Sequence, residues 1–246
     1  MEKQTKRAQL SMIIMRRILM EMQTGVYKDM VRLPPELEIS RELGVSRTVI
    51  RDSMAMLEQE GFISRKHGLG TIINHHVLKV NTRLDIEKEF FDMIRDADYT
   101  PSVQVLDIQE TTAGERVGAI LGIPFDSDVI RISRVAYANN IPAIYYVDTI
   151  DKNLIVDFSY TKKDLQENIF EFLKKFCKME VYTDLTEVQA VNAEPPVTKI
   201  LDVPYGKSLL LLDECGYDLK GQAILHSEEY YRNDIFHHYV VRKKVL

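Results

Sequence analysis

The sequence predicts an α+β protein of two domains, and three observations lead to this prediction. The chain has 246 residues, 45% of them hydrophobic, which is enough for two hydrophobic cores. Helical patterns followed by a short hairpin occupy residues 1–75, and an internal repeat of helices and strands fills much of residues 99–246. Residues 76–98 are expected to connect the two domains, and their amphipathic segment, from Leu84 to Ile94, is predicted to form a short helix.

Charge is divided unevenly along the chain, whose overall net charge is −5. Residues 1–80 hold 13 Lys/Arg and 9 Asp/Glu, a net of +4, whereas the rest holds 19 and 28, a net of −9. This asymmetry indicates a basic module that meets an anion and an acidic module that does not. A chance fluctuation of composition is the alternative.

Three classes of protein are not expected. No apolar stretch approaches the ~20 residues that cross a bilayer, and the polar residues after Met1 do not form a signal peptide. The two cysteines, Cys177 and Cys215, are far apart, so neither a disulfide scaffold nor a cysteine metal site is expected. We therefore expect a cytoplasmic protein with no cofactor and no membrane partner.

Three helices are predicted in the first domain. Gly25 and Gly44 end the first two, Pro35 suits the first turn of the second, and Ser46 is a good N-cap for the third. Apolar residues at three- and four-residue spacing give the expected ranges 6–24, 36–43 and about 46–59.

A β-hairpin is predicted after the third helix. Phe62–Arg65 and Thr71–Ile73 are short strand-like runs, and the turn between them is rich in glycine and basic residues. Two short helices joined by Gly44-Val45 and followed by a hairpin have the layout of a winged helix-turn-helix.

In that layout the second helix of the pair enters the major groove of DNA with its N-terminal residues toward the base edges. Arg47 and Arg51 are four apart and project from one face, and arginine is the usual bidentate reader of guanine. The alternative is that both are only solvated helix surface. The candidate DNA contacts, wing included, are Ser46, Arg47, Thr48, Arg51, Lys66, His67, Gly68 and Gly70.

The run LPPELEISRELGVSRTVIRDSMAMLEQEGFISRKHGLGTIIN resembles the DNA-binding domain of the GntR family of bacterial repressors. The resemblance implies operator base contacts by Arg47 and Arg51 and a minor-groove contact by His67-Gly68. Pro35 stands where the family usually has Ser, which removes a side-chain cap. Leu37 stands where it usually has Arg, which removes a DNA contact, so operator preference or affinity is expected to differ from that of relatives.

An internal repeat marks the second domain. Residues 117–125 match residues 197–205 at an offset of 80, and after the turns an offset of 81 pairs Tyr145 with His226 and Asp148 with Glu229. Each unit is predicted as helix, tight turn, strand, turn and strand, so the two predict one pseudo-twofold domain around an antiparallel sheet. Coincidence is the alternative.

Residues 99–243 resemble the UTRA effector-binding domain of the HutC branch of the GntR family. The resemblance implies a sheet fold similar to chorismate lyase, a small-molecule pocket, and a homodimeric regulator rather than an enzyme. It is carried by Tyr99-Thr-Pro101-Ser102, Gly122-Ile-Pro124, the Pro142 hairpin and the closing run from Ser227 to Asp234.

The pocket positions depart from those of sugar-phosphate-binding relatives, which use two arginines, two glutamates and a tyrosine. Only Arg134 and Tyr231 keep their type here, so the pocket is expected to be more apolar. We expect a ligand more apolar than an amino-sugar phosphate, with an anionic end on Arg134, unless Arg134 pairs with Asp148 or Glu214 instead. The candidate effector contacts are Ser102, Arg134, Ala136, Tyr146, Leu225 and Tyr231.

The expected function is a repressor whose dimer binds a palindromic operator under the control of a small molecule. Release from DNA is the more usual response in the family, and the direction stays open here. One alternative is a lyase-like enzyme fused to a DNA-binding domain, by fold analogy alone, and another is an architectural DNA-binding protein without an effector. The sequence has no catalytic motif such as a Gly-rich phosphate loop, and the pairs His75-His76 and His237-His238 do not favour a metal site.

Overall fold

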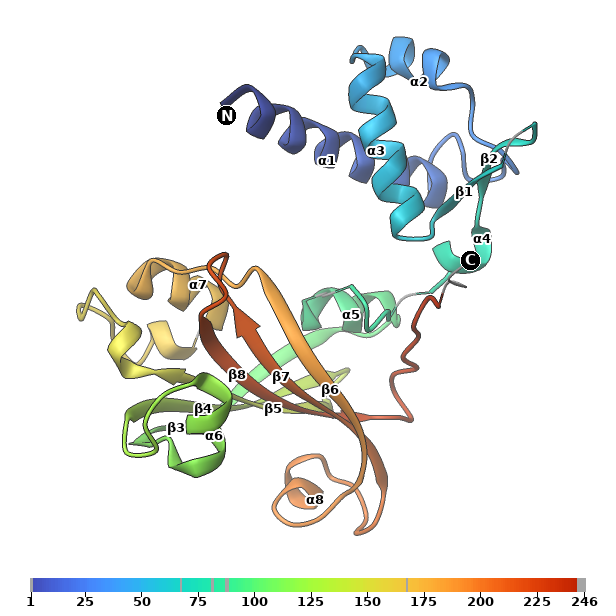
Figure 1. The fold of residues 1–246 in the computed structure, drawn as a ribbon. Coiled ribbons are helices and arrows are strands. Elements are labelled where there is room, and N and C mark those ends of the chain that lie inside the picture. Colours follow the sequence, from blue (N-terminus) through green and yellow to red (C-terminus); the bar gives the residue numbers. More distant parts are fainter. Residues whose placement is uncertain (1, 67, 81, 87–88, 167, 243–246) are drawn as a thin grey trace. The chain divides into compact units, whose positions relative to one another are not determined.

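The computed structural model describes residues 2–66, 68–80, 82–86, 89–166 and 168–242. The chain forms two compact units, which divide between Glu87 and Lys88 and again between His237 and His238. The first unit is mainly helical with a two-stranded hairpin, and the second is built on a six-stranded antiparallel sheet (Figure 1). The predicted α+β fold class is therefore confirmed.

The first unit has the predicted helices and hairpin, with small shifts at their ends. The hairpin begins at Ile63 rather than Phe62, because the Phe62 amide donates to the Leu57 carbonyl at 2.9 Å and closes the preceding helix. Gly44 ends the second helix with φ +66°, a left-handed conformation that suits glycine. The elements are α1 (Glu2–Gln23), α2 (Glu36–Leu43), α3 (Arg47–Gln59), β1 (Ile63–Lys66), β2 (Gly70–Ile73) and α4 (His75–Leu78).

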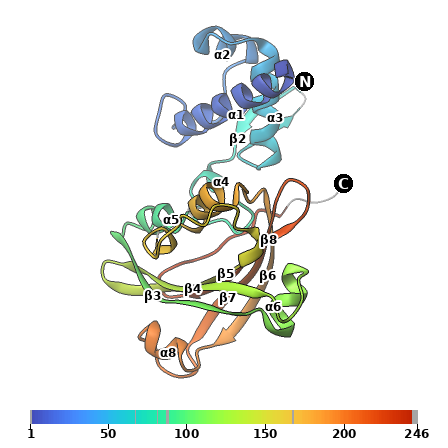
Figure 2. The ribbon, with the colours of Figure 1, turned by 90° about the vertical axis from the view of Figure 1, so that its left-hand side faces the viewer.

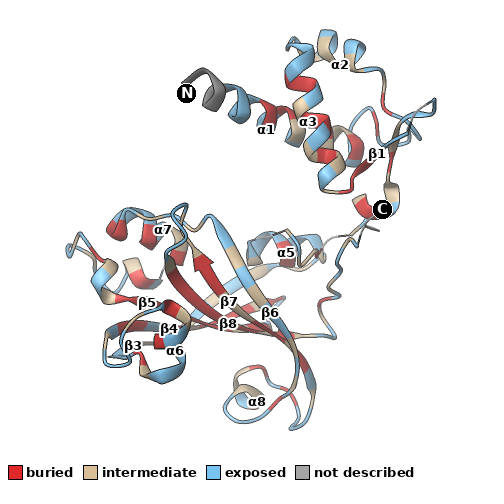
Figure 3. Cartoon of the chain, viewed as in Figure 1, coloured by how far each residue is buried: buried red, intermediate tan, exposed pale blue. Residues whose placement is uncertain are grey.

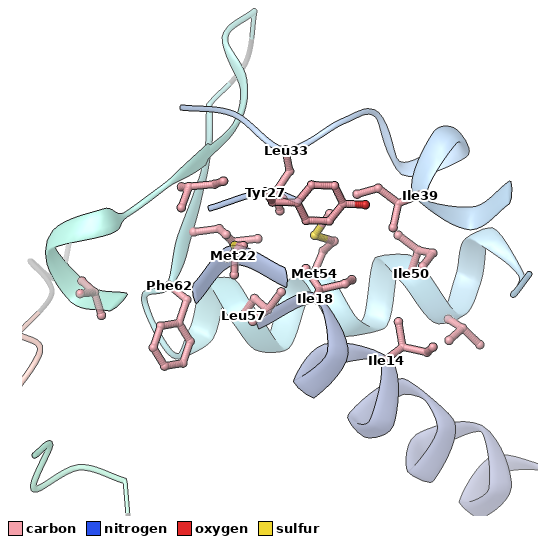
Figure 4. Close-up of a cluster of buried hydrophobic side chains, with 14 residues drawn as sticks. Ile14, Ile18, Met22, Tyr27, Leu33, Ile39, Ile50, Met54, Leu57 and Phe62 are labelled. Atoms are coloured by element: carbon pink, nitrogen blue, oxygen red, sulfur yellow. The ribbon is translucent and has the colours of Figure 1, made fainter. Parts of the chain in front are cut away.

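One hydrophobic core joins these elements, and Figure 4 shows its side chains converging from α1, α2, α3 and the loops. Ile18, Ile39 and Ile50 are fully buried within it. Burying such a side chain contributes about 1.5–3 kcal/mol. The hydroxyl of Ser53 on α3 lies 2.7 Å from the carbonyl oxygen of Ser11 on α1, so a polar contact also fixes the two helices together.

The second unit is a sheet in the strand order β3-β4-β5-β8-β7-β6, with every neighbouring pair antiparallel. Short helices lie between the strands in sequence. The elements are α5 (Phe90–Asp96), β3 (Pro101–Thr112), α6 (Gly114–Leu121), β4 (Asp128–Ala138), β5 (Ile141–Asp151), η1 (Lys152–Leu154), η2 (Asp164–Gln166), α7 (Ile169–Phe172), η3 (Leu173–Cys177), β6 (Thr183–Asn192), α8 (Val197–Ile200), β7 (Ser208–Tyr217) and β8 (Ala223–Arg232).

The sheet confirms the repeat that the sequence predicted. Its strand order places β3, β4 and β5 on one side of the centre and β6, β7 and β8 in mirrored order on the other. At the centre Val147 of β5 pairs with Glu228 of β8, two residues that the offset of 81 also relates. A pseudo-twofold axis therefore passes through this pair, and Asp148 and Glu229 occupy equivalent places around it.

The two faces of the sheet are covered by different helices. On one, which we call the α7 face, Ile132 and Leu225 pack with Phe172 and Phe176. On the other, the α6–α8 face, α6 packs on β8 and α8 on β5, and α5 and α8 lie on opposite sides of the sheet (Figure 2). The central strands carry mostly buried residues, whereas β6 at the edge alternates between exposed and intermediate ones (Figure 3).

The connector is divided between the units. The sequence predicts one short helix in its amphipathic segment, but α5 covers only Phe90–Asp96, and Ile86 packs against the core of the first unit. Residues 238–242 also belong to the first unit, whereas the sequence placed them in the second domain. The reason is backbone pairing, because the Tyr239 amide donates to Thr82 and its carbonyl accepts from Leu84, both at 2.9 Å.

Candidate DNA interface and effector site

The predicted recognition helix is α3, and local interactions fix where it begins and which face it exposes. The Ser46 hydroxyl accepts a hydrogen bond from the Val49 amide at 3.3 Å, as an N-cap does. The side chains of Val49 and Ile50 are buried in the core, so the opposite face of the first turns is exposed. Ser46, Arg47, Thr48 and Arg51 all lie on that exposed side.

The two arginines differ in their surroundings. The Nε of Arg51 lies 3.9 Å from Oε2 of Glu36 on α2, and 64% of the Arg51 side chain is exposed. An ion pair this long and this exposed contributes little, so the guanidinium can exchange its partner for a base or a phosphate. Arg47, one turn earlier, is exposed. The geometry therefore leaves both side chains available to DNA.

The wing is the β1–β2 hairpin, in which Lys66 pairs with Gly70. Gly68 and Gly70 have φ values of +77° and +79°, so the turn needs residues that adopt the left-handed region easily. Both glycines and Lys66 are exposed. The predicted contact His67 lies outside the described residues.

The structure shows the surroundings of the two residues that depart from the usual GntR pattern, Pro35 and Leu37. Pro35 precedes the helix and supplies no side-chain hydrogen bond to its first turn. Leu37 is 43% exposed, so an apolar side chain lies at the surface where the resemblance places an arginine.

The structure brings five of the six candidate effector residues together on the α7 face. Residues paired across neighbouring strands share a face, and Arg134 pairs with Tyr146 while Ala136 pairs with Ile144, which in turn pairs with Tyr231. Ser102 is exposed and pairs with Tyr137, so it projects from the opposite face. The five that share the α7 face are Arg134, Ala136, Tyr146, Leu225 and Tyr231, and all are buried.

Arg134 adopts the pairing that the sequence left as an alternative. Its Nη1 donates to Oδ2 of Asp148, and its Nη2 donates to the carbonyl oxygen of Leu165 at 2.8 Å. The Ser227 hydroxyl donates to the other carboxylate oxygen of Asp148 at 2.8 Å. Burial raises the pKa of Asp148, and the neighbouring guanidinium opposes that rise. An anionic ligand would have to compete with Asp148 for Arg134.

An aromatic cluster lies beside this ion pair. The ring of Phe90, from α5, is 4.7 Å from that of Tyr146 and 6.3 Å from that of Tyr231, between centroids. The guanidinium carbon of Arg134 lies 5.8 Å from the centre of the Tyr146 ring. The Tyr231 hydroxyl donates to Glu229 at 2.6 Å. Sequence reasoning missed Phe90, although the amphipathic pattern of its segment showed that it faces an apolar surface.

Glu214 occupies the place in the second repeat that Arg134 occupies in the first. Burial, together with the nearby carboxylates Asp184, Asp148 and Asp213, raises its pKa from 4.5 to about 7, although the Thr186 hydroxyl donates to it at 2.9 Å. The pseudo-twofold axis thus relates a buried cation to a carboxyl group that titrates near neutral pH.

The elevated pKa of Glu214 gives a testable pH dependence. Between pH 4.5 and about 7 the folded chain binds this proton and the unfolded chain does not, so the free energy of unfolding should fall as pH rises. Glu214→Gln keeps the acceptor for Thr186 and removes the proton. Urea titrations at pH 5 and pH 8 should show a smaller loss of stability in the variant than in the parent chain. Equal losses would show that Glu214 is not protonated in the folded state.

The described residues contain neither a cluster of metal-ligating side chains nor a membrane-spanning helix. Within the ranges that the structure describes, no group of three or more His, Cys, Asp or Glu side chains could hold a metal ion. His75 lies in α4, with Nε2 2.9 Å from the Met30 carbonyl oxygen. No helix of the described chain is both long and apolar enough to span a bilayer.

Two family models match the chain, one in each of its two units. The model of the gntR family of bacterial regulatory proteins matches residues 10–73, and the UTRA domain model matches residues 96–237, more than half of the chain. The chain belongs to the GntR family. It is a DNA-binding transcription regulator with a UTRA effector-binding domain, and the resemblance stated from the sequence is confirmed.

Relatives of this GntR-family regulator cover nearly its whole length. It is similar to the HTH-type transcriptional repressor NagR of Bacillus subtilis, with 26% identity over 93% of both chains. It is also similar to the histidine utilization repressor of Pseudomonas aeruginosa, with 27% identity over 79% of this chain and 76% of that one. These relatives are repressors, so the enzyme alternative considered from the sequence is not supported.

Solved structures show the same fold. The possible transcriptional regulator YydK of Bacillus subtilis matches with a TM-score of 0.74 and 18% identity, over 93% of this chain and 99% of that one. PhnF of Mycobacterium smegmatis matches with a TM-score of 0.59 and 16% identity, over 86% and 91%.

Proposed function

We propose that this GntR-family regulator reads its operator with the N-terminal turns of α3. Ser46, Arg47, Thr48 and Arg51 contact the bases and adjacent phosphates in the major groove. Lys66, Gly68 and Gly70 bring the wing to the DNA backbone or minor groove, together with His67. The observation that supports this proposal is the orientation of α3. Val49 and Ile50 bury one face of the helix in the core, so the opposite face is exposed.

We also propose that the regulator acts as a homodimer on a palindromic operator. One winged helix reads only a few base pairs, whereas two related by a twofold axis double the contacts and match the symmetry of a palindrome. The sheet unit is acidic and is repelled by DNA, so it is the unit suited to the dimer contact.

The effector is proposed to bind on the α7 face, next to Tyr146 and Tyr231. Two buried tyrosines and Phe90 provide apolar surface and ring faces. Because Asp148 already neutralises Arg134, a phosphate group gains less there than beside an unpaired arginine. The proposed ligand is therefore more apolar than an amino-sugar phosphate.

Titration with glucosamine 6-phosphate tests this ligand preference. The operator is first obtained by selection from random DNA duplexes, and its affinity is then measured by fluorescence anisotropy at fixed salt. We expect millimolar glucosamine 6-phosphate to leave the operator Kd unchanged, with glucose 6-phosphate as a matched control. Tight binding of the amino-sugar phosphate with release of the DNA would contradict the proposal.

A further inference from the structure

The α7 face of the sheet carries more acidic than basic side chains. Cross-strand pairing places Asp148, Glu229 and Glu214 on this face, on the neighbouring strands β5, β8 and β7. Among the described residues that β4, β5, β8 and β7 direct to it, Arg134 is the one cation, and Asp148 holds its guanidinium. One carboxylate therefore matches the charge of Arg134, and two further carboxyl groups lie on the same surface.

These carboxyl groups already accept the hydroxyl donors beside them. The Tyr231 hydroxyl donates to Glu229 at 2.6 Å. The Thr186 hydroxyl donates to Glu214 at 2.9 Å. Because an ionised carboxylate can accept about four hydrogen bonds, acceptor positions on this surface outnumber the donors. A ligand that brings its own N–H donors is therefore favoured there.

The hydroxyl of Tyr146 is a polar group that the chain does not satisfy. Tyr146 is 7% exposed, yet within the part of the chain that the structure describes its hydroxyl has no hydrogen-bond partner. Burial raises its pKa, and the carboxylates of Asp148 and Glu229 raise it further, so the hydroxyl lies among the acidic groups. Buried polar groups are normally hydrogen-bonded, so this hydroxyl points to a ligand group that pairs with it.

Aromatic rings adjoin the carboxyl groups. Phe90, Tyr146 and Tyr231 form the aromatic cluster described above. Burial raises the pKa of Tyr231, and the carboxyl groups of Glu229 and Glu214 raise it further, so rings and carboxyl groups are neighbours. The faces of aromatic rings attract cations, and sets of such rings recognise ammonium groups in other proteins. A cation on an apolar frame thus suits both parts of this surface.

We propose that the effector of this regulator carries a cationic nitrogen group on an apolar frame, with the nitrogen between Tyr146 and the carboxyl groups of Glu229 and Glu214. This inference rests on the effector site proposed above and names the class of ligand that it takes. The nitrogen donates hydrogen bonds to the Tyr146 hydroxyl and to a carboxylate, and charge-assisted bonds of this kind are the stronger ones. A ligand with a carboxylate or phosphate in the same place is repelled by the two glutamates.

Binding of benzylamine, benzyl alcohol and benzoate to the full chain tests the charge preference, because the three share a ring and differ in charge. Titrations followed by ligand NMR are made at pH 8, where the amine is cationic and Glu214, whose pKa is about 7, is ionised. We expect benzylamine to bind at least about tenfold more tightly than benzyl alcohol. Benzoate should bind more weakly than either.

A matched pair of variants assigns the preference to the acidic side of the site. Glu214→Gln keeps an acceptor for the Thr186 hydroxyl and removes the charge, so the preference for benzylamine should fall to about threefold or less. Glu187→Gln makes the same change on the neighbouring strand β6. Glu187 is exposed and pairs with Asp213, so it lies on the opposite face of the sheet, and its variant should keep the full preference.

A further variant keeps the proposal falsifiable if Glu214→Gln fails to fold. Tyr146→Phe retains the ring and removes only the hydroxyl, and it should weaken the binding of benzylamine. Three results would overturn the inference: no binding of benzylamine at millimolar concentration, equal affinities for benzylamine and benzyl alcohol, or a preference unchanged in every folded variant. Each would leave the proposed function intact, since that is tested by the response of operator affinity to small molecules.

Discussion

Replacing Arg47 with alanine is expected to weaken operator binding by about 1–3 kcal/mol per half-site, or 5- to 150-fold. Arg47 is exposed in the first turn of α3, where the N-cap at Ser46 sets the start of the helix. A bidentate contact to guanine is lost in the variant, so its preference at one base position should relax as well. Anisotropy titrations with the selected operator and with single-base variants of it measure both effects.

A matched control separates base reading from general electrostatics. Arg16→Ala removes the same charge from an exposed position on a different helix, α1. We expect it to weaken binding to all duplexes alike, by the amount that a phosphate contact or the general field contributes. If Arg47→Ala lost no more affinity than Arg16→Ala and kept full base preference, α3 would not be the recognition helix.

Replacing Asp148 with alanine is expected to destabilise the sheet unit by about 3–5 kcal/mol. Arg134 is 2% exposed, and its ion pair with Asp148 lies wholly inside the unit. The substitution leaves a buried guanidinium without its counter-charge and removes the acceptor of the Ser227 hydroxyl. Urea unfolding followed by far-ultraviolet circular dichroism should show the sheet unit melting first, with the helical unit little affected.

The double variant Arg134→Met with Asp148→Leu supplies the control for this prediction. It removes both charges and replaces them with apolar side chains of similar length, so most of the lost stability should return. A stability of Asp148→Ala close to that of the parent chain would show that the pair is not buried in solution. A double variant as unstable as Asp148→Ala would show that packing volume rather than unpaired charge causes the loss.

The fold of the first unit was predictable because short-range chemistry determines it. Ser46 as an N-cap and Gly44 at the end of α2 act over a few residues, so the sequence pattern places the helices directly. The repeat predicted the pseudo-twofold sheet for a similar reason, since equivalent sequences fold into equivalent strands and turns. The shift of β1 from Phe62 to Ile63 depends on one backbone hydrogen bond, which no pattern shows.

The candidate effector site was predictable only in part. The resemblance gave Arg134, Tyr146 and Tyr231 as pocket positions, but the choice of Asp148 as the partner of Arg134 depends on the register of β4 with β5. Ser102 was included because of its motif. The alternation of Ser102 with Val103 along β3 could have shown that it projects from the other face.

The role of the chain end could not have been predicted from local sequence. Tyr239 pairs with residues more than 150 positions earlier, and the rings of Phe90 and Tyr231 meet although 141 positions separate them in the sequence. Contacts between such distant segments depend on tertiary packing rather than on propensity.

The most direct test of the central claim measures operator affinity in the presence of small molecules from the cell. That claim is that one chain joins an operator-reading unit to a ligand-binding sheet. Fractions of an ultrafiltered cell extract are added to the protein and its selected operator, and the Kd is measured for each. We predict that at least one fraction changes the Kd by about fivefold or more, and that the change is lost when Tyr146 and Tyr231 are both replaced with alanine in a folded variant. If no fraction changed the Kd, the protein would be a DNA-binding protein without an effector, and the account would be contradicted.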